Sequence, residues 1–354
     1  GSIYASATIF SSLLLIWVGK KIDDYRILNY SLFVVILLFA SSLFFSFINS
    51  IYLLAIGIFL MRFSGQGLMS HTSTTTISRF FERSRGKALS TIWFGLSTAE
   101  FILPALITYF FLIYSWRTVW QGIAVLIILF LPLVILNTIK SIKLDSREVD
   151  TNTKNKLKIK SWKRRDVLKD YRFYIVSLNM LAMPWIATGV FVYQSFISDS
   201  KMWAIYTIPK AFMVYSITSI ATLFVSGFLV DKFTGRKLIM YMNIPLLFAM
   251  ITLFYFNHEI FAYVFLGLIG VSNGLANILG SSTWAEIYGV KYIGSIKALT
   301  TAFMVFSTAF GTAVFGLLID KGFTIENIAF LGGAYVVISL ALLIIIRKTI
   351  EPVR

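Results

Sequence analysis

The chain has 354 residues, of which 58% are hydrophobic, 16% aromatic and only 14% charged. So much apolar surface excludes an ordinary water-soluble domain and predicts a protein embedded in a lipid bilayer. With no cysteine and only two histidines, the sequence also excludes disulfides and thiolate metal sites, and we expect neither a metal nor another cofactor. The formal net charge of +16 leaves nucleic-acid binding open until the basic residues are placed.

Long apolar stretches recur along the chain. Each has about 18 to 25 residues, enough to cross roughly 30 Å of hydrocarbon as an α-helix. They predict an all-α integral membrane protein with eleven transmembrane helices. In chain order, the predicted windows are 2–19, 29–48, 51–75, 88–113, 118–139, 173–197, 207–230, 238–257, 260–285, 297–319 and 326–346.

The basic residues sort to one side of the predicted membrane. Of the 32 lysines and arginines, 27 fall in loops on that side, and Arg62 lies inside a span. The four on the other side are Arg117, Lys201, Lys210 and Lys321. By the positive-inside rule the basic side is cytoplasmic, together with the central loop and the C-terminus. The positive charge therefore serves orientation and contact with lipid headgroups, and we expect no nucleic-acid partner.

The first apolar window, 2–19, predicts a helix rather than a signal peptide, because no basic region precedes it and no small-residue cleavage site follows it. The basic stretch that follows it places its C-terminal end on the cytoplasmic side, so this helix enters the membrane from outside. Because Gly1 is not an initiator methionine, we expect one helix to be missing, which gives 11 of 12.

One long polar segment divides the chain. We expect an N-terminal transmembrane bundle with five of six helices over 1–139, a cytoplasmic basic linker over 140–172, and a C-terminal bundle of six helices over 173–354. Two local similarities indicate that the halves are related. The pattern Gly19-x-x-x-Asp23 recurs as Gly227-x-x-x-Asp231 at an offset of 208 residues. The pattern KALST from Lys87 recurs as KALTT from Lys297 at an offset of 210.

The segment GFLVDKFTGRK, which begins at Gly227, resembles a loop signature of the major facilitator superfamily, G-x-x-x-D-R/K-x-G-R/K-R/K, with one inserted residue. The earlier copy keeps the glycine and the first aspartate but has Asp24 where a basic residue is usual. The resemblance covers essentially the whole chain and implies two pseudo-symmetric helical bundles that rock about a central site. It also implies a gating loop made of Gly19, Asp23, Gly227, Asp231, Lys232, Gly235, Arg236 and Lys237. The alternative to a gating loop is a tight turn whose basic residues only set the orientation in the membrane.

Two further loops, SRFFERSRGKA from Ser78 and YGVKYIG from Tyr288, resemble the monocarboxylate and oxalate–formate branch of that superfamily. This resemblance implies transport of a small organic anion, coupled to a proton, across the cytoplasmic (inner) membrane. The same fold could instead export drugs, or act as a sensor or lipid-handling protein without solute flux. The expected partners are the solute, a coupling proton and the lipid bilayer, and we expect a monomer. No enzyme motif is present, so we expect no catalytic activity.

Two charges fall near the middle of predicted spans. Arg62 and Glu100 each lie about eleven or twelve residues into a span, at similar depth. Arg62 could attract an anionic substrate, with Glu100 as its counter-ion or as a proton carrier. The equally weighted alternative is a permanent structural ion pair, because a facing pair offsets much of the cost of burying either charge alone.

Other candidates are polar or aromatic residues in the middle of spans, which could line a cavity between the bundles. The ones we expect to contact substrate are Trp93, Trp185, Asn273 and Asn277. For any single one of them, the role of a packing residue or an interfacial anchor is the commoner one.

Overall fold

The computed structural model describes residues 2–81, 84–142, 161–204 and 206–350. Within these ranges the regular elements are helices and no strand occurs, as the apolar windows predicted. Residues 143–160, the centre of the predicted linker, lie outside the described part. The elements are α1 (Ser2–Val18), η1 (Gly19–Asp23), α2 (Ile27–Ser46), α3 (Ile51–Met61), η2 (Arg62–Met69), α4 (Ser70–Phe80), α5 (Arg85–Ile113), α6 (Trp116–Ile142), α7 (Arg164–Val167), α8 (Tyr171–Val192), α9 (Gln194–Lys201), α10 (Thr207–Phe233), α11 (Gly235–Leu238), η3 (Ile239–Tyr241), α12 (Ile244–Tyr255), α13 (Ile260–Tyr288), α14 (Ile293–Asp320) and α15 (Ile325–Ile346).

Nine helical segments of the described chain are long and apolar enough to cross a membrane. They are Ile27–Ser46, Ile51–Phe80, Trp116–Ile139, Tyr171–Val192, Thr207–Phe233, Gly235–Tyr255, Ile260–Tyr288, Ile293–Asp320 and Ile325–Ile346. The two other predicted windows, 2–19 and 88–113, coincide with α1 and α5, which are helical but are not among the nine. The total of eleven spans therefore stays a prediction.

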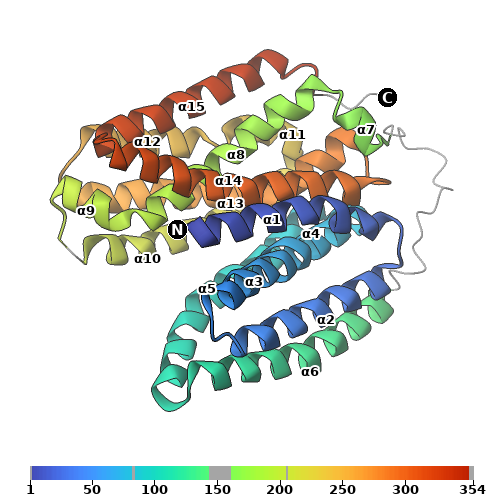
Figure 1. Cartoon of the computed structure of the whole chain (residues 1–354). Helices are drawn as coiled ribbons and strands as arrows, with labels where there is room; N and C mark the ends of the chain where they lie inside the picture. The colour runs from blue at the N-terminus through green and yellow to red at the C-terminus, as the bar shows by residue number, and fades with distance from the viewer. Residues whose placement is uncertain (1, 82–83, 143–160, 205, 351–354) are drawn as a thin grey trace.

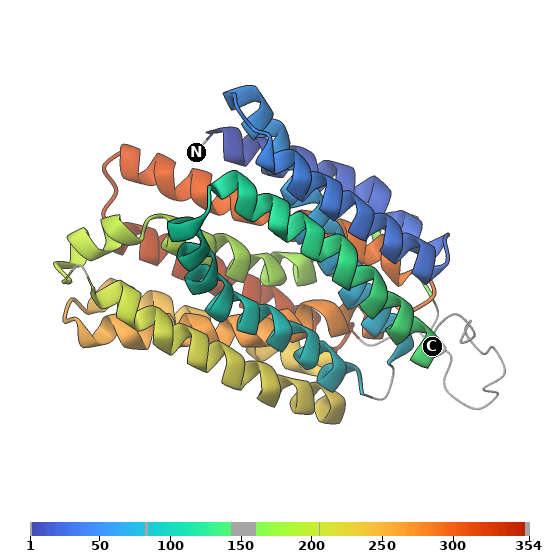
Figure 2. The same cartoon turned by 90° about the horizontal axis from the view of Figure 1, so that it is seen from below.

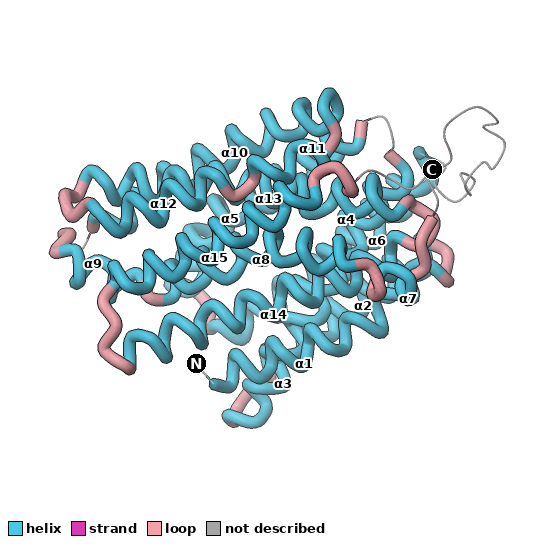
Figure 3. The backbone as a smooth tube through the Cα atoms, turned by 90° about the horizontal axis from the view of Figure 1, so that it is seen from above, coloured by secondary structure: helices cyan, strands magenta, loops and turns pink. Residues whose placement is uncertain are grey.

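The long helices form two bundles that lie side by side (Figures 1 and 2). The N-terminal bundle holds α1 to α6, and the C-terminal bundle holds α8 to α15. Between them, α5 packs against α10 and α1 packs against α14, while α2 and α6 lie on the outer side of the first bundle. We call the end of the bundles that carries η1, α7 and α11 the linker end, and the opposite end, which carries α9, the far end (Figure 3).

The helices of the two bundles correspond at a single offset of 208 residues. At this offset α1 falls on α10, α2 on α11 and α12, the continuous run from α3 to α4 on α13, α5 on α14, and α6 on α15. Helix α8 has no counterpart among the described residues. The internal repeat indicated by the sequence is therefore present in the element order as well.

An apolar groove lies between α5 and α6, the counterparts of α14 and α15. In the C-terminal bundle, α8 packs against both α14 and α15. Their counterparts α5 and α6 instead enclose a groove of about 620 Å³, which we call the outer groove. Its walls are apolar side chains such as Leu106, Phe110, Ile123 and Leu126.

The third predicted helix, over the window 51–75, is wound irregularly at its centre. Residues Arg62–Met69, which include Gly65 and Gly67, form a π-helical segment between α3 and α4. Such wide turns are rare and occur mostly at functional sites, because they re-aim the side chains that follow. Here the side chains of Gln66, Ser70 and Thr74 reach the space between the bundles.

Candidate functional site

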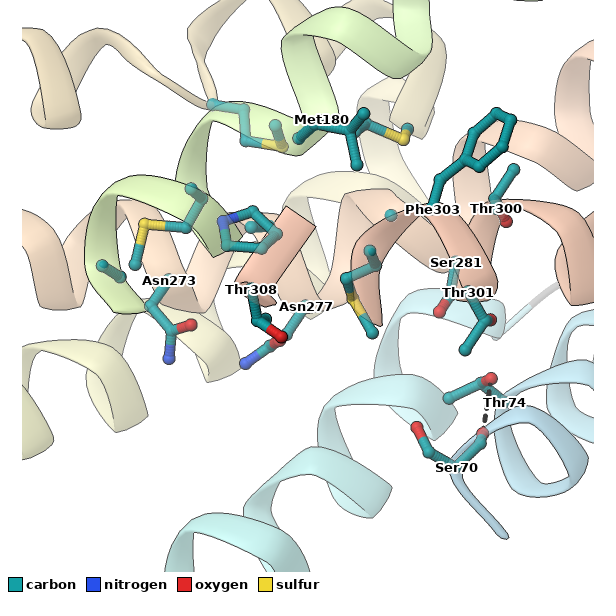
Figure 4. A pocket seen from close by; sticks show the side chains of 18 of the residues that line it. Ser70, Thr74, Met180, Asn273, Asn277, Ser281, Thr300, Thr301, Phe303 and Thr308 are labelled. Atoms are coloured by element: carbon teal, nitrogen blue, oxygen red, sulfur yellow. Dashed lines mark hydrogen bonds between the residues drawn. The ribbon is translucent and has the colours of Figure 1, made fainter. Parts of the chain in front are cut away.

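A cavity of about 380 Å³ lies between the two bundles, and we call it the central cavity. Figure 4 shows its hydroxyl-bearing and amide side chains, which come from α4, α13 and α14. The lining residues with polar side chains are Gln66, Ser70, Thr74, Trp93, Ser177, Thr188, Tyr215, Asn273, Asn277, Ser281, Trp284, Lys297, Thr300, Thr301 and Thr308. The described lining therefore combines polar and apolar side chains and contains no aspartate or glutamate.

Three of the four predicted contact residues line this cavity. Trp93, Asn273 and Asn277 are on its wall, and the amide of Asn273 also donates a hydrogen bond to Ser219 Oγ over 3.0 Å. Trp185 lies elsewhere. It is 7% exposed in the core of the C-terminal bundle, where its ring packs edge-on against Tyr335 with the centroids 5.3 Å apart. The sequence offered no means of telling these tryptophans apart, because both lie within predicted apolar spans.

The predicted pair of Arg62 and Glu100 is only half described. Glu100 lies in α5, but its side chain is outside the described residues. The guanidinium of Arg62 stacks on the ring of Tyr4, with Cζ 4.4 Å from the ring centroid, and donates a hydrogen bond to Gln66 Oε1. Arg62 does not line the central cavity, although its partner Gln66 does.

Asp231, at the linker end of α10, binds the N-terminus of a helix in the opposite bundle. Its carboxylate oxygens accept hydrogen bonds from the backbone N–H groups of Gly86, over 2.7 Å, and Lys87, over 3.2 Å. These amides belong to the first turn of α5, where helical N–H groups lack partners and the helix dipole favours a negative charge. We call this contact the Asp231 cap.

The other bundle makes the reciprocal contact. Asp23 accepts hydrogen bonds from the amides of Gly294, over 3.0 Å, and Ser295, over 2.6 Å, in the first turn of α14. It also forms an ion pair with Arg79. Burial raises the pKa of the Asp23 carboxyl, whereas the charge of Arg79 and the two amides act in the opposite direction. Arg79 thus offsets part of the cost of burying this carboxylate. We call this contact the Asp23 cap.

Glycine lets the two helices approach each other at the Asp231 cap. A Cβ atom on Gly86 would collide with the backbone carbonyl oxygen of Gly227, and one on Gly227 would lie 2.8 Å from Ser90 Oγ. At the Asp23 cap, a Cβ atom on Gly294 would likewise collide with Ile22 and Asp23. Gly227 of the loop signature, with Gly86 and Gly294 at the helix N-termini, therefore permits the closure that the aspartates then hold.

The two caps fix the register of the repeat. Asp23 and Asp231 are 208 residues apart, and so are the residues they bind, Gly86 and Gly294. The KALST and KALTT segments, at an offset of 210, are thus out of register by two residues. In the structural register, Lys297 corresponds to the fully buried Leu89 rather than to Lys87.

The basic residues of the loop signature do not bind Asp231 in the described structure. The backbone N–H groups of Gly235 and Arg236 donate instead to Glu286 on α13, over 2.9 and 3.0 Å. Lys232 lies over the ring of Phe233, with Nζ 5.1 Å from the centroid, and Lys237 is exposed. Sequence reasoning missed Glu286, because its partners lie about fifty residues earlier in the chain.

All hydrogen bonds between the bundles that the structure gives for described side chains lie at the linker end. Besides the two caps, Ser78 Oγ donates to the carbonyl oxygen of Ser281 over 3.4 Å. At the same end, Arg164 of α7, in the linker, donates to the carbonyl oxygen of Ile16 over 3.0 Å. The central cavity is thus closed off at the linker end, so the structure shows a conformation in which that end is shut.

Two helical bundles around a central polar cavity, closed at one end by reciprocal caps, define a class of multi-pass integral membrane protein with a solute-sized internal site. The sequence model of the family described as Major Facilitator Superfamily matches residues 1–312. The chain therefore belongs to the major facilitator superfamily of transporters.

Other comparisons agree on the fold. The solved structure of the MFS proton:xylose symporter XylE bound to 6-bromo-6-deoxy-D-glucose is similar to this chain, with a TM-score of 0.67 at 12% sequence identity. The likeness covers 99% of this chain and 85% of that one. At so low an identity it shows the fold alone. No curated protein matches the sequence.

Proposed function

We propose that this protein is a secondary active transporter that moves a small organic anion, such as a monocarboxylate, across the cytoplasmic membrane by alternating access, coupled to a proton. The observation that carries the proposal is the pair of reciprocal caps, in which each bundle supplies the aspartate for a helix N-terminus of the other. Such contacts can hold one access state and must break in the opposite one. They fit a transporter better than a static binding protein.

The charge of the central cavity supports an anionic solute. Lys297 is the one charged residue in the described lining, and no acidic side chain accompanies it there. Drug export by the same fold predicts an acidic residue in the cavity. The described lining gives that alternative no support, although the side chain of Glu100 is not described.

The basic loops support the orientation. The linker end carries Lys20, Lys21, Arg164, Arg165 and Lys237, and the positive-inside rule assigns this end to the cytoplasm. The linker and the C-terminus would then be cytoplasmic, and the conformation described here would be the one shut toward the cytoplasm. We further propose that the protein works as a monomer, since each bundle finds its closing partner within the same chain.

Uptake by proteoliposomes is the test of this function. We expect saturable uptake of small labelled monocarboxylates, faster with an acidic exterior than with a neutral one, because an inward proton gradient drives symport. Binding of a solute without vectorial uptake would contradict transport and favour a sensor or lipid-handling role. If the anions are taken up at the same rate with and without a pH gradient, transport is not coupled to a proton.

We also propose that a further apolar helix covers the outer groove and completes twelve spans. The support is the pseudo-symmetry, since α8 fills the equivalent place between α14 and α15. The chain has no cysteine, so single cysteines can report on the groove without background. Gly122 is exposed in the groove, and Leu129 is 56% exposed on α6 outside it. In native membranes, Gly122→Cys should react far more slowly than Leu129→Cys with a membrane-soluble maleimide, and equal rates would mean that the groove is open to lipid.

A further inference from the structure

Lys297 is a buried basic residue whose side-chain amine has no hydrogen-bond partner. It lies in the second turn of α14 and is 2% exposed, yet its Nζ atom has no hydrogen-bond partner. A buried ammonium group left without a counter-charge is unfavourable by several kcal/mol. In the other half of the chain, the fully buried Leu89 occupies the corresponding place. An apolar side chain therefore satisfies the packing at the corresponding position of the other half. Packing alone does not explain why position 297 holds a lysine.

Other buried donors in the same cavity share this property. The indole Nε1 atoms of Trp93 and Trp284 are buried and have no hydrogen-bond partner, and both side chains line the central cavity with Lys297. Ammonium and indole N–H groups can donate hydrogen bonds but cannot accept them. These three donors lack acceptors in a cavity whose described lining has no carboxylate, so an acceptor on the solute can satisfy them.

Nearby groups do not neutralise Lys297. The carboxylate of Glu286 is engaged by the amides of Gly235 and Arg236. His71 and Arg85 lie close enough for electrostatic interaction with Lys297, and each could only add positive charge. The Nε2 atom of His71 is 3.0 Å from the carbonyl oxygen of Gly19 and is occupied there. Of these groups only Lys297 lines the central cavity, where no acidic side chain of the described lining balances it.

We propose that Lys297, with the indole N–H groups of Trp93 and Trp284, forms the carboxylate-binding subsite of the central cavity, and that the solute is a monocarboxylate with an apolar body. The assignment rests on the proposed anion transport and names its substrate class. One cation balances one negative charge, and a second carboxylate would be buried without a partner. The side chains of Met180, Phe303 and Met304 supply an apolar wall for the rest of the solute.

Binding by the purified full chain in proteoliposomes tests the subsite. The probes are 4-methyl-2-oxopentanoate, its neutral primary amide, and the dianion succinate. We expect the monoanion to bind best, and Lys297→Met to weaken its binding about 10- to 100-fold, since hydrogen bonds to charged groups contribute about 1.5–3 kcal/mol. Lys297→Arg, which keeps the charge, should retain most of the affinity.

Stability provides a second readout that separates binding from structure. Because Lys297→Met removes a buried charge and leaves an apolar side chain of similar length, we expect its thermal midpoint to be equal to or above that of the unmodified protein. The matched control is Lys321→Met, an exposed lysine that caps the far end of the same helix, which should change neither binding nor stability. A lowered midpoint for Lys297→Met would show that the lysine has a structural role, and would overturn the subsite.

The remaining outcomes distinguish this proposal from the proposed function. If the unmodified protein transports the monoanion and Lys297→Met binds it equally well, the subsite is wrong while anion transport stands. The same conclusion follows if Arg62→Gln loses the affinity and Lys297→Met does not, which would favour the midplane arginine. If the amide binds as well as the acid, or no probe is bound, both the anionic solute and the subsite are wrong.

Discussion

Replacing Gly86 with leucine should disfavour closure at the linker end and reduce transport by about tenfold or more. The Cβ atom alone would overlap the carbonyl oxygen of Gly227, which is backbone and cannot rotate aside. Overpacking of this kind typically costs about 1–3 kcal/mol, and about 1.4 kcal/mol corresponds to a tenfold change in an equilibrium constant. The cost falls only on the closed conformation, where α5 and α10 touch at this point. The access equilibrium should therefore shift toward the state that is open at the linker end.

The shift can be measured as a distance between the bundles. Arg26 and Lys237 are exposed at the linker end of different bundles, and the chain has no native cysteine, so spin labels on Arg26→Cys and Lys237→Cys report their separation cleanly. The control is Gly95→Leu on the same helix, where an added Cβ meets no atom within 4 Å. We expect the two labels to stay as close together in Gly95→Leu as in the labelled protein without that substitution. An unchanged distance distribution in Gly86→Leu would mean that the two helices do not need this glycine to close.

The sequence predicted the helices well, because burial in a bilayer demands long apolar stretches whatever their packing. It also identified Gly227 and Asp231, because the loop signature is a local pattern. What it could not supply were the partners: Asp23 binds the amides of Gly294 and Ser295, which are remote in the chain and whose backbone groups carry no side-chain signal. Likewise, the loop signature did not reveal that Asp231 binds the amides of Gly86 and Lys87, which lie about 145 residues earlier in the chain.

Lys297 shows where charge counting misleads. Counted by sequence, it belongs with the basic residues of a cytoplasmic loop, since it follows Lys291 by six positions. The helix in fact begins at Ile293, which carries Lys297 into the protein interior. A repeat register of 208 residues, which Gly19 and Gly227 already gave, would have aligned it with Leu89 and revealed a lysine at an apolar position. The KALST match at 210 concealed this.

Asp231→Asn should shift the access equilibrium about 10- to 100-fold toward the state that is open at the linker end. The carboxylate accepts two backbone hydrogen bonds at the N-terminus of α5, and hydrogen bonds to a charged acceptor contribute about 1.5–3 kcal/mol each, part of which water restores on opening. Asparagine keeps the shape but removes the charge, and it turns an N–H donor toward amides that also donate. The spin-label distance between the bundles and the rate of solute uptake both report the change.

The matched control is Asp24→Asn, because Asp24 is an exposed aspartate next to the Asp23 cap and should leave the equilibrium unchanged. Combining Asp231→Asn with Gly86→Leu then separates a latch from a simple turn. Both substitutions break the same contact, so the double variant should open little further than the stronger single variant. If the effects of the two substitutions on the access equilibrium add fully, Asp231 does not act through its contact with Gly86. The reciprocal caps would then not control access. A lowered thermal midpoint without any change in distance would make Asp231 a turn residue rather than a gate.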